Sequence, residues 1–174
     1  VLKELTPAEG VTPYQLNSAL FSDYAFKARF VKIPSGTKAV YNPDEVLDFP
    51  IGTVLIKNFY YPADFRKPTE NIRILETRLL IREETEWKTL PYIWNEEQTE
   101  AYLDVAGKSI PVQWTHYNGE LKSINYSVPN MNQCKGCHLR GEKVMPIGPS
   151  ARQLNGEMDY AHRTQNQLIY WQEK

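Results

Sequence analysis

The stretch Ile72-Arg73-Ile74-Leu75-Glu76-Thr77-Arg78-Leu79-Leu80-Ile81-Arg82 carries the clearest fold signal in this chain. Successive side chains of a β-strand point to opposite faces, and here they separate into two sets. One face takes Leu75, Thr77, Leu79 and Ile81, and the other takes Glu76, Arg78, Leu80 and Arg82. This period of two predicts a half-buried strand.

Segments of similar character surround this strand. They are rich in β-branched and aromatic residues and cover residues 27–33, 38–41, 53–60, 88–94, 101–105, 110–116 and 123–128. Asn118-Gly119 lies between the last two segments, and this dipeptide is the strongest short signal for a hairpin. Residues 12–24 carry Pro, Asn, Ser and Asp at turn positions and predict an ordered loop or a short helix. The pattern predicts a mostly antiparallel β-rich region over about residues 25–128.

The character of the sequence changes after Pro129. Asn130 can cap a short helix through residues 134–138, and Leu168 and Trp171 have helical spacing within residues 164–173. A chain of 174 residues can bury one hydrophobic core, so we expect a single domain over residues 1–174. The predicted fold class is α+β, with a short helical segment over about residues 129–174.

Charge and hydropathy exclude several classes of partner. The chain has 20 Lys and Arg against 21 Asp and Glu, which gives nucleic-acid binding no support. Its apolar stretches are too short and too interrupted for a membrane span. The first five residues lack the basic start and apolar core of a signal peptide.

The run Cys134-Lys135-Gly136-Cys137-His138 is the strongest functional motif, and it contains both cysteines of the chain. A C-x-x-C-H run is the attachment signature of a c-type haem. The two thiols add across the haem vinyl groups, and the following histidine becomes the proximal iron ligand. The sequence therefore predicts one covalently bound haem c, held by Cys134, Cys137 and His138.

Two other uses of the cysteine pair were weighed. A thioredoxin-like dithiol favours a position early in a βαβ unit, whereas this pair follows a long β-like region. A structural zinc site needs four ligands, and the three histidines His116, His138 and His162 are far apart in the sequence. Dithiol, disulfide and zinc stay open as the weaker alternatives.

The second iron ligand separates electron transfer from ligand chemistry. Met145 lies seven residues beyond His138, and Pro146 after it would stiffen a ligand loop. Met145 is thus the first candidate, although methionines often only fill a core. The other candidates are Met158, His162 and His116, or an open iron. Arg140 and Arg152, with Lys143, are candidate partners of the haem propionates, because a guanidinium binds a carboxylate through two parallel hydrogen bonds.

Five segments together resemble a poorly characterised family of bacterial exported diheme c-type cytochromes. They are Leu16-Asn17-Ser18-Ala19-Leu20-Phe21-Ser22-Asp23-Tyr24-Ala25, Trp94-Asn95-Glu96, Pro129-Asn130-Met131-Asn132-Gln133-Cys134-Lys135-Gly136-Cys137-His138, Pro146-Ile147-Gly148-Pro149 and Asn166-Gln167-Leu168. The resemblance implies that this chain is a first haem domain, and that in the family a second C-x-x-C-H region follows. The resemblance implies a role in haem binding for Cys134, Cys137 and His138 and for no other residue.

These observations predict a periplasmic electron-transfer domain that passes single electrons to another redox protein or to a neighbouring haem domain. Haem c is attached outside the cytoplasm, so we expect an export signal that was removed. The motif comes late in a β-rich chain, unlike the nearly all-helical class I cytochrome c fold. The alternatives are an enzyme or a gas or peroxide sensor with five-coordinate haem, where His116 or Arg152 supplies a polar distal pocket, and a binding module with an accessory haem.

Overall fold

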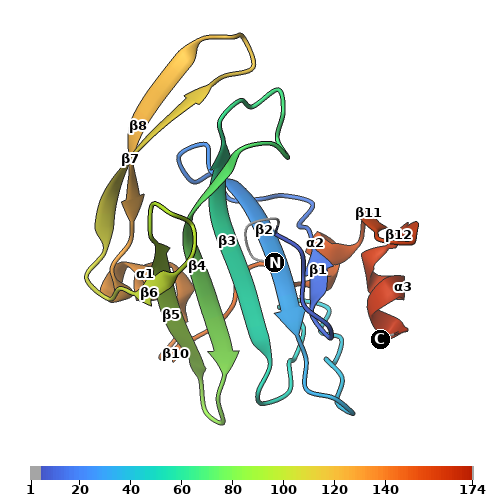
Figure 1. The fold of residues 1–174 in the computed structure, drawn as a ribbon. Coiled ribbons are helices and arrows are strands. Elements are labelled where there is room, and N and C mark those ends of the chain that lie inside the picture. The colour runs from blue at the N-terminus through green and yellow to red at the C-terminus, as the bar shows by residue number, and fades with distance from the viewer. Residues whose placement is uncertain (1–4, 174) are drawn as a thin grey trace.

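The computed structural model describes residues 5–173, except for the side chain of Lys135. Residues 1–4, which belong to the stretch that lacks a signal-peptide pattern, lie outside the described residues. Within the described part, a six-stranded antiparallel sheet forms the centre of the fold (Figure 1). Its strands are β1 (Thr12–Tyr14), β2 (Phe26–Lys32), β3 (Val54–Pro62), β4 (Ile72–Arg82), β5 (Trp87–Trp94) and β6 (Ala101–Leu103). Each strand pairs with the next one in the chain, as in a meander.

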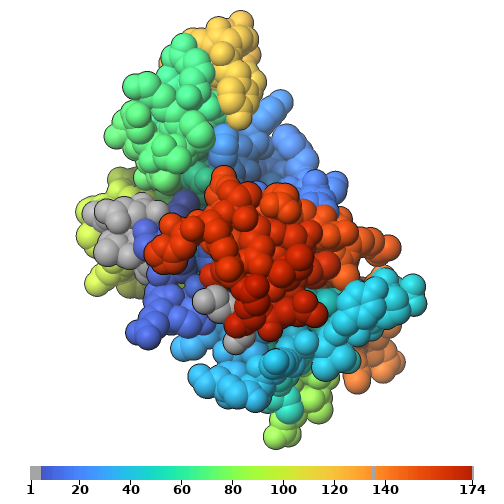
Figure 2. All heavy atoms as spheres, turned by 90° about the vertical axis from the view of Figure 1, so that its right-hand side faces the viewer, coloured from blue at the N-terminus to red at the C-terminus, as the bar shows by residue number. Residues whose placement is uncertain are grey.

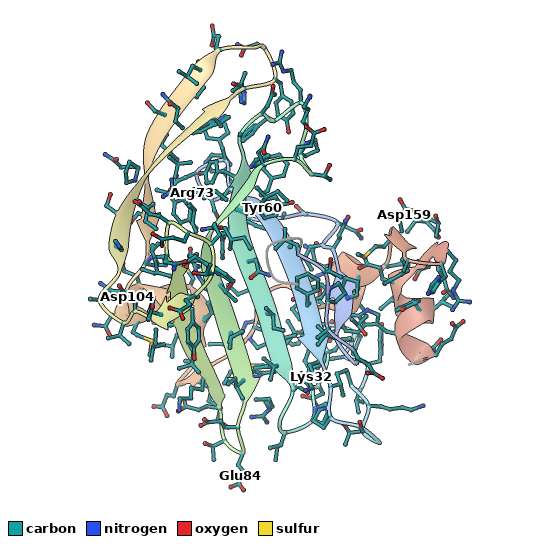
Figure 3. All side chains as sticks on the ribbon, viewed as in Figure 1. Lys32, Tyr60, Arg73, Glu84, Asp104 and Asp159 are labelled. Carbon is teal, nitrogen blue, oxygen red and sulfur yellow. The ribbon has the colours of Figure 1, made fainter. Side chains whose placement is uncertain are left out.

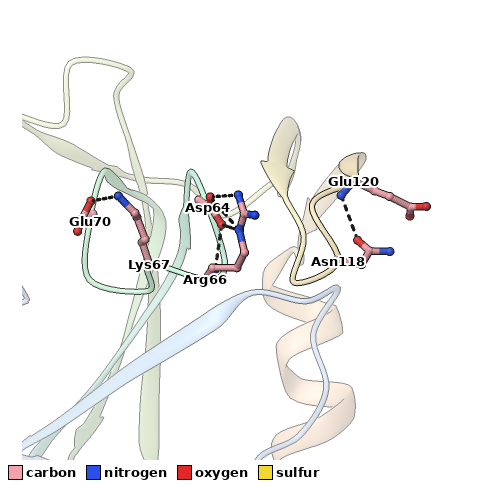
Figure 4. Close-up of polar contacts among 6 residues, drawn as sticks. All are labelled: Asp64, Arg66, Lys67, Glu70, Asn118 and Glu120. Atoms are coloured by element: carbon pink, nitrogen blue, oxygen red, sulfur yellow. Dashed lines mark hydrogen bonds and ion pairs between the residues drawn. The ribbon is translucent and has the colours of Figure 1, made fainter.

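A separate hairpin consists of β7 (Lys108–Thr115) and β8 (Leu121–Val128). The predicted turn joins these strands, and Gly119 adopts the positive φ of 82° that such a turn requires. The loop between β3 and β4 is fastened to this hairpin by backbone hydrogen bonds from Phe65 to Thr115 and from Thr115 to Ala63, both of 2.9 Å. Figure 4 shows this loop beside the turn, with the ion pair between Asp64 and Arg66.

The remaining elements are short. They are α1 (Met131–His138), β9 (Leu139–Arg140), β10 (Lys143–Val144), α2 (Ala151–Leu154), β11 (Glu157–Tyr160), β12 (Arg163–Asn166) and α3 (Gln167–Gln172). β9 pairs with β10 and β11 pairs with β12. The predicted fold class is confirmed, because the described chain is a mostly antiparallel β structure with only short helices.

Three local expectations differ from the structure. Residues 12–24 begin with the edge strand β1, which the expected loop or short helix did not include, and continue as a loop. Residues 38–41 form only an isolated bridge between Val40 and Asp48. The segment after residue 128 contains four short strands as well as helices, and the first three residues of the predicted helix over residues 164–173 belong to strand β12. Whether a short segment forms a strand depends on a neighbouring segment that pairs with it, and the local sequence pattern does not identify that neighbour.

The core lies on one face of the sheet, called here the inner face and defined by Leu55, Phe59 and Leu80. The cross-strand pairs Leu55–Leu80 and Phe59–Glu76 place these residues on the same side. One apolar cluster packs the hairpin on this face through the side chains Ile110, Val112, Trp114, Tyr126 and Val128. A second cluster packs the C-terminal segment there through Val144, Ala151 and Leu154. The inner face is therefore covered from two sides.

Gln167, at the start of α3, ties the C-terminal segment to the N-terminal edge of the sheet. Its amide is 2% exposed, accepts a hydrogen bond from the Gln15 N–H at 2.8 Å and donates one to the Gln15 carbonyl at 3.2 Å. The Tyr14 and Trp171 rings pack edge to face, with centroids 5.6 Å apart. Figure 2 shows the C-terminal residues gathered on this side of the molecule.

On β4, the inner face is the one that carries the charged residues Glu76, Arg78 and Arg82 together with Leu80. Glu76 is completely buried there and Leu80 is buried beside it, whereas Leu79 and Ile81 on the other face are partly exposed. A register shift between Phe59 and Tyr60 leaves Leu75 without a paired residue on β3 and brings it into the hairpin cluster. The predicted strand is confirmed, and the covered face carries a buried carboxylate.

Among residues 5–173, none of the helices reaches the length and apolar character needed to cross a bilayer.

Candidate functional site

Helix α1 holds the C-x-x-C-H motif, and a reciprocal pair of hydrogen bonds closes its first turn. The Gln133 N–H donates to Asn130 Oδ1, and the Asn130 N–H donates to Gln133 Oε1, both at 2.9 Å. This is the geometry of a capping box, which satisfies N–H groups that have no partner within a helix. The predicted capping role of Asn130 is confirmed.

The start of α1 is joined to the turn between β6 and β7 by a backbone hydrogen bond of 3.2 Å from the Met131 N–H to the Val105 carbonyl oxygen. Asp104 Oδ1 accepts hydrogen bonds from the Ala106 and Gly107 N–H groups, each at 2.9 Å, and Figure 3 labels Asp104 near α1. A Cβ at Gly107 would lie 2.7 Å from the Val128 carbonyl oxygen and 2.9 Å from the Asn130 nitrogen. Only glycine fits here, because φ is also positive, at 81°.

The two cysteines occupy different environments. Cys134 and Cys137 are three residues apart on α1 and are therefore neighbours on the helix surface. Cys134 is 6% exposed, and its burial raises the pKa of the thiol, whereas Cys137 is exposed. Both thiols are free of disulfide bonds. One thiol thus faces the protein interior and the other faces solvent.

His138 is held by the backbone of Met145. Its Nδ1 lies 2.8 Å from the Met145 carbonyl oxygen, and the Met145 N–H donates to the His138 carbonyl oxygen at 2.8 Å. A carbonyl oxygen can only accept, so Nδ1 carries the proton and Nε2 of the neutral ring is left as a free electron-pair donor. Burial, followed by the charges of Lys57 and Arg78, lowers the pKa of His138 despite this hydrogen bond and favours the neutral ring. This is the arrangement of a metal-binding histidine with a backbone partner behind it.

The same contact locates Met145. Its carbonyl lies on the Nδ1 side of the imidazole, and a metal on Nε2 would lie on the opposite side of that ring. This geometry favours a role for the Met145 backbone in orienting His138. Its predicted role as the distal ligand stays a prediction.

The other distal candidates lie on separate elements. Met158 is part-buried on β11, and His162 is exposed in the turn that follows it. His116 accepts a hydrogen bond at Nδ1 from the indole N–H of Trp114, at 3.3 Å, and its ring packs near Phe65. None of these contacts links a candidate to α1.

The predicted propionate partners are surface residues. Arg140 forms an ion pair with Glu45, and their side chains are 60% and 41% exposed. Lys143 is exposed on β10, and Arg152 is exposed on α2. Their predicted role in binding a propionate is open.

Sequence reasoning missed three cations on the inner face. The strand register aligns Arg29 of β2 with Lys57 of β3, and Lys57 with Arg78 of β4. Two of these inner cations interact electrostatically with the motif: Lys57 and Arg78 lower the pKa of His138, and Arg78 opposes the burial that raises the pKa of Cys134. The sequence shows a charged residue within each of these strands, but it does not show that the three are aligned on the covered face.

The zinc alternative gains no support from the geometry. Within the described part of the chain, no group of three or more His, Cys, Asp or Glu side chains is arranged to hold a metal ion. The motif itself presents two neighbouring thiols free of disulfide bonds and a histidine with an available Nε2.

Comparisons with known proteins add no relative. No family model matches the chain, and neither a curated protein nor a solved structure matches it.

Proposed function

We propose that this protein is a periplasmic c-type cytochrome domain that binds one haem c covalently and transfers single electrons to a partner redox centre. Cys134 and Cys137 form the two thioether bonds, and His138 provides the proximal ligand. The iron supplies the ferrous–ferric couple when the haem is bound. The partner is another redox protein or a neighbouring haem domain, in keeping with the resemblance to exported diheme cytochromes.

The hydrogen bond between His138 and Met145 carries this proposal. It gives the histidine of the motif one protonated nitrogen with a fixed partner and one free nitrogen. A backbone carbonyl behind a metal-binding imidazole orients the ring and increases the basicity of the ligating nitrogen. The two cysteines of the same helix are free of disulfide bonds, so both thiols remain available to the haem vinyl groups.

The position of the cysteines supports electron exchange at the surface. Cys137 is exposed and Cys134 is buried, so a group attached to both thiols extends from the interior to solvent. An exposed edge of this kind lets a partner approach the group, while the covered side excludes water. The residues of α1 therefore anchor and orient the haem. Transfer of a single electron requires no side chain of this chain to exchange a proton.

The test begins with attachment. The full chain is produced in a periplasm that contains the haem-attachment machinery, next to a Cys134→Ser/Cys137→Ser variant. We expect the mass of the wild-type chain to increase by one haem and that of the variant to stay unchanged. Wild-type protein without attached haem would overturn the proposal.

Absorption spectra with and without carbon monoxide then separate electron transfer from the rival reading. A six-coordinate low-spin spectrum that carbon monoxide does not alter supports electron transfer. A high-spin spectrum that shifts with carbon monoxide would instead indicate an enzyme or a sensor with five-coordinate haem, and the electron-transfer proposal would be rejected.

A further inference from the structure

Three positive side chains lie side by side on the inner face of the sheet. Arg29, Lys57 and Arg78 are direct cross-strand neighbours on β2, β3 and β4. Like charges directly opposite one another destabilise a sheet. An interior position makes this arrangement more costly, because the low local dielectric strengthens the repulsion.

The inner cations are held close together and largely away from solvent. Arg29 is 7% exposed, and the side chain of Arg78 is 18% exposed. The ammonium of Lys57 lies 4.6 Å from the centre of the Phe59 ring, and the guanidinium of Arg78 lies 4.2 Å from the same centre. The buried ring of Phe59 thus lies beneath two of the three charges.

The carboxylates of the described residues do not balance this charge. Glu76 binds Arg78 through hydrogen bonds of 2.5 and 2.8 Å and neutralises one cation. Arg29 and Lys57 form no ion pair with any of the described acidic side chains. A fourth cation, Lys27, lies on the same face and donates to the Leu20 carbonyl. Among residues 5–173, Arg29 and Lys57 are therefore basic side chains of the inner face without an ion-pair partner.

Two of these cations lie close enough to the proposed attachment motif to act on it electrostatically. Lys57 and Arg78 both act on His138, and Arg78 also acts on Cys134. The cations lie between the hairpin cluster and the C-terminal cluster, because Lys57 is flanked along β3 by Phe59 of the first and Leu55 of the second.

We propose that Arg29 and Lys57, supported by the Arg78–Glu76 pair, bind the propionate carboxylates of the haem. This inference rests on the proposed function. Two propionates supply two negative charges, which is the compensation that Arg29 and Lys57 lack. Arg140 is less suited to this role, because it already pairs with Glu45 at the surface.

The first experiment uses the haem-attached full chain. Arg29→Met and Lys57→Met are compared with Lys32→Met, an exposed lysine on the opposite face at the end of β2, labelled in Figure 3. We expect the first two variants to lower the reduction potential and the denaturant midpoint of the ferric protein, since a nearby cation favours the less positive ferrous state. Lys32→Met is expected to change neither. Equal effects in all three variants would overturn the inference.

The second experiment tests the carboxylates themselves. The Cys134→Ser/Cys137→Ser chain is titrated with ferric protoporphyrin IX and with its dimethyl ester, which lacks the propionate charges. We expect the free acid to bind more tightly, and Lys57→Met to reduce this preference. Equal affinity for acid and ester would reject propionate binding. If this chain does not fold without attached haem, the potentials of the attached variants decide.

The two proposals fail in different ways. Absence of haem from the wild-type chain after periplasmic production would reject the proposed function. Attached haem whose potential and stability are insensitive to Arg29→Met and Lys57→Met would leave that function intact and reject the inference alone.

Discussion

The hydroxyl of Tyr126 donates a hydrogen bond of 2.5 Å to the carboxylate of Glu76 and so joins the hairpin to the inner face of the sheet. Both residues are almost fully buried, at 1% and 0% exposure. Burial and the neighbouring carboxylate raise the pKa of Tyr126, so the hydroxyl stays protonated and continues to donate. The contact lies within an otherwise apolar cluster and specifies how the hairpin packs on the sheet.

Tyr126→Phe removes this hydroxyl and keeps the ring. We expect a loss of about 1–3 kcal/mol in the free energy of unfolding, because a buried carboxylate loses a donor. Urea denaturation measures the loss. Tyr102→Phe is the matched control, since the Tyr102 hydroxyl also binds a carboxylate, that of Glu100, but on the surface. An equal loss in both variants would contradict the special role of Tyr126.

Glu76→Gln removes the only carboxylate among residues 5–173 that pairs with Arg78. We expect a loss of about 3–5 kcal/mol, because Arg78 then remains as a buried cation without a counter-charge. Glu120→Gln, which breaks the exposed pair with Lys122, is expected to change stability by less than about 1 kcal/mol. Denaturation of both variants under the same conditions provides the measurement, and a small loss in Glu76→Gln would show that solvent reaches Arg78.

Asn130→Ala opens the capping box of α1. The expected cost is about 1 kcal/mol, because the Gln133 N–H loses its side-chain acceptor. Asn132→Ala on the same helix is the control, since Asn132 is exposed. Comparison of their denaturant midpoints checks the prediction, which is wrong if the two variants are equally stable.

Met145→Leu separates the two roles of Met145. Its contact with His138 uses backbone atoms, so the variant keeps the histidine partner. We expect the haem-attached variant to retain the wild-type absorption spectrum. Loss of a far-red sulfur-to-iron band would instead establish Met145 as the distal ligand.

The chain without attached haem should gain stability at alkaline pH through Lys57. Burial, followed by the charges of Arg29, Arg78 and Lys27, lowers the pKa of Lys57 from 10.5 to about 7. Between these values the unfolded chain binds more protons than the folded chain, so the free energy of unfolding rises with pH. The contribution is absent below about pH 7, where both states are protonated.

Lys57→Met should remove this rise, and Lys32→Met should keep it. Denaturation of the Cys134→Ser/Cys137→Ser chain and of its two lysine variants, at pH values from 6 to about 10, measures the difference. Parallel pH profiles for the parent chain and Lys57→Met would mean that the ammonium is solvated.

The β4 strand, the hairpin turn and the helix cap could be predicted from the sequence because their signals are local. The alternation in β4, the Asn-Gly turn and the Asn130 cap each act within a few residues, and all three are present in the structure. The inner cations could not be predicted, because their meaning depends on which residues of neighbouring strands are aligned. The same pattern of two faces fits either orientation of β4, and only packing of the hairpin and the C-terminal segment selects the one that buries Glu76.

The unequal environments of the two cysteines also set an order of events in time. With Cys134 6% exposed in the folded chain, a reagent or an attachment enzyme reaches its sulfur only before α1 docks on the sheet or when α1 opens. The exposed Cys137 has no such restriction. Thiol labelling should therefore proceed in two phases, a fast one at Cys137 and a slow one at Cys134 whose rate reports local unfolding of α1. Biogenesis of the mature protein would then be a competition between modification and folding, in which early docking of α1 leaves the chain half-modified.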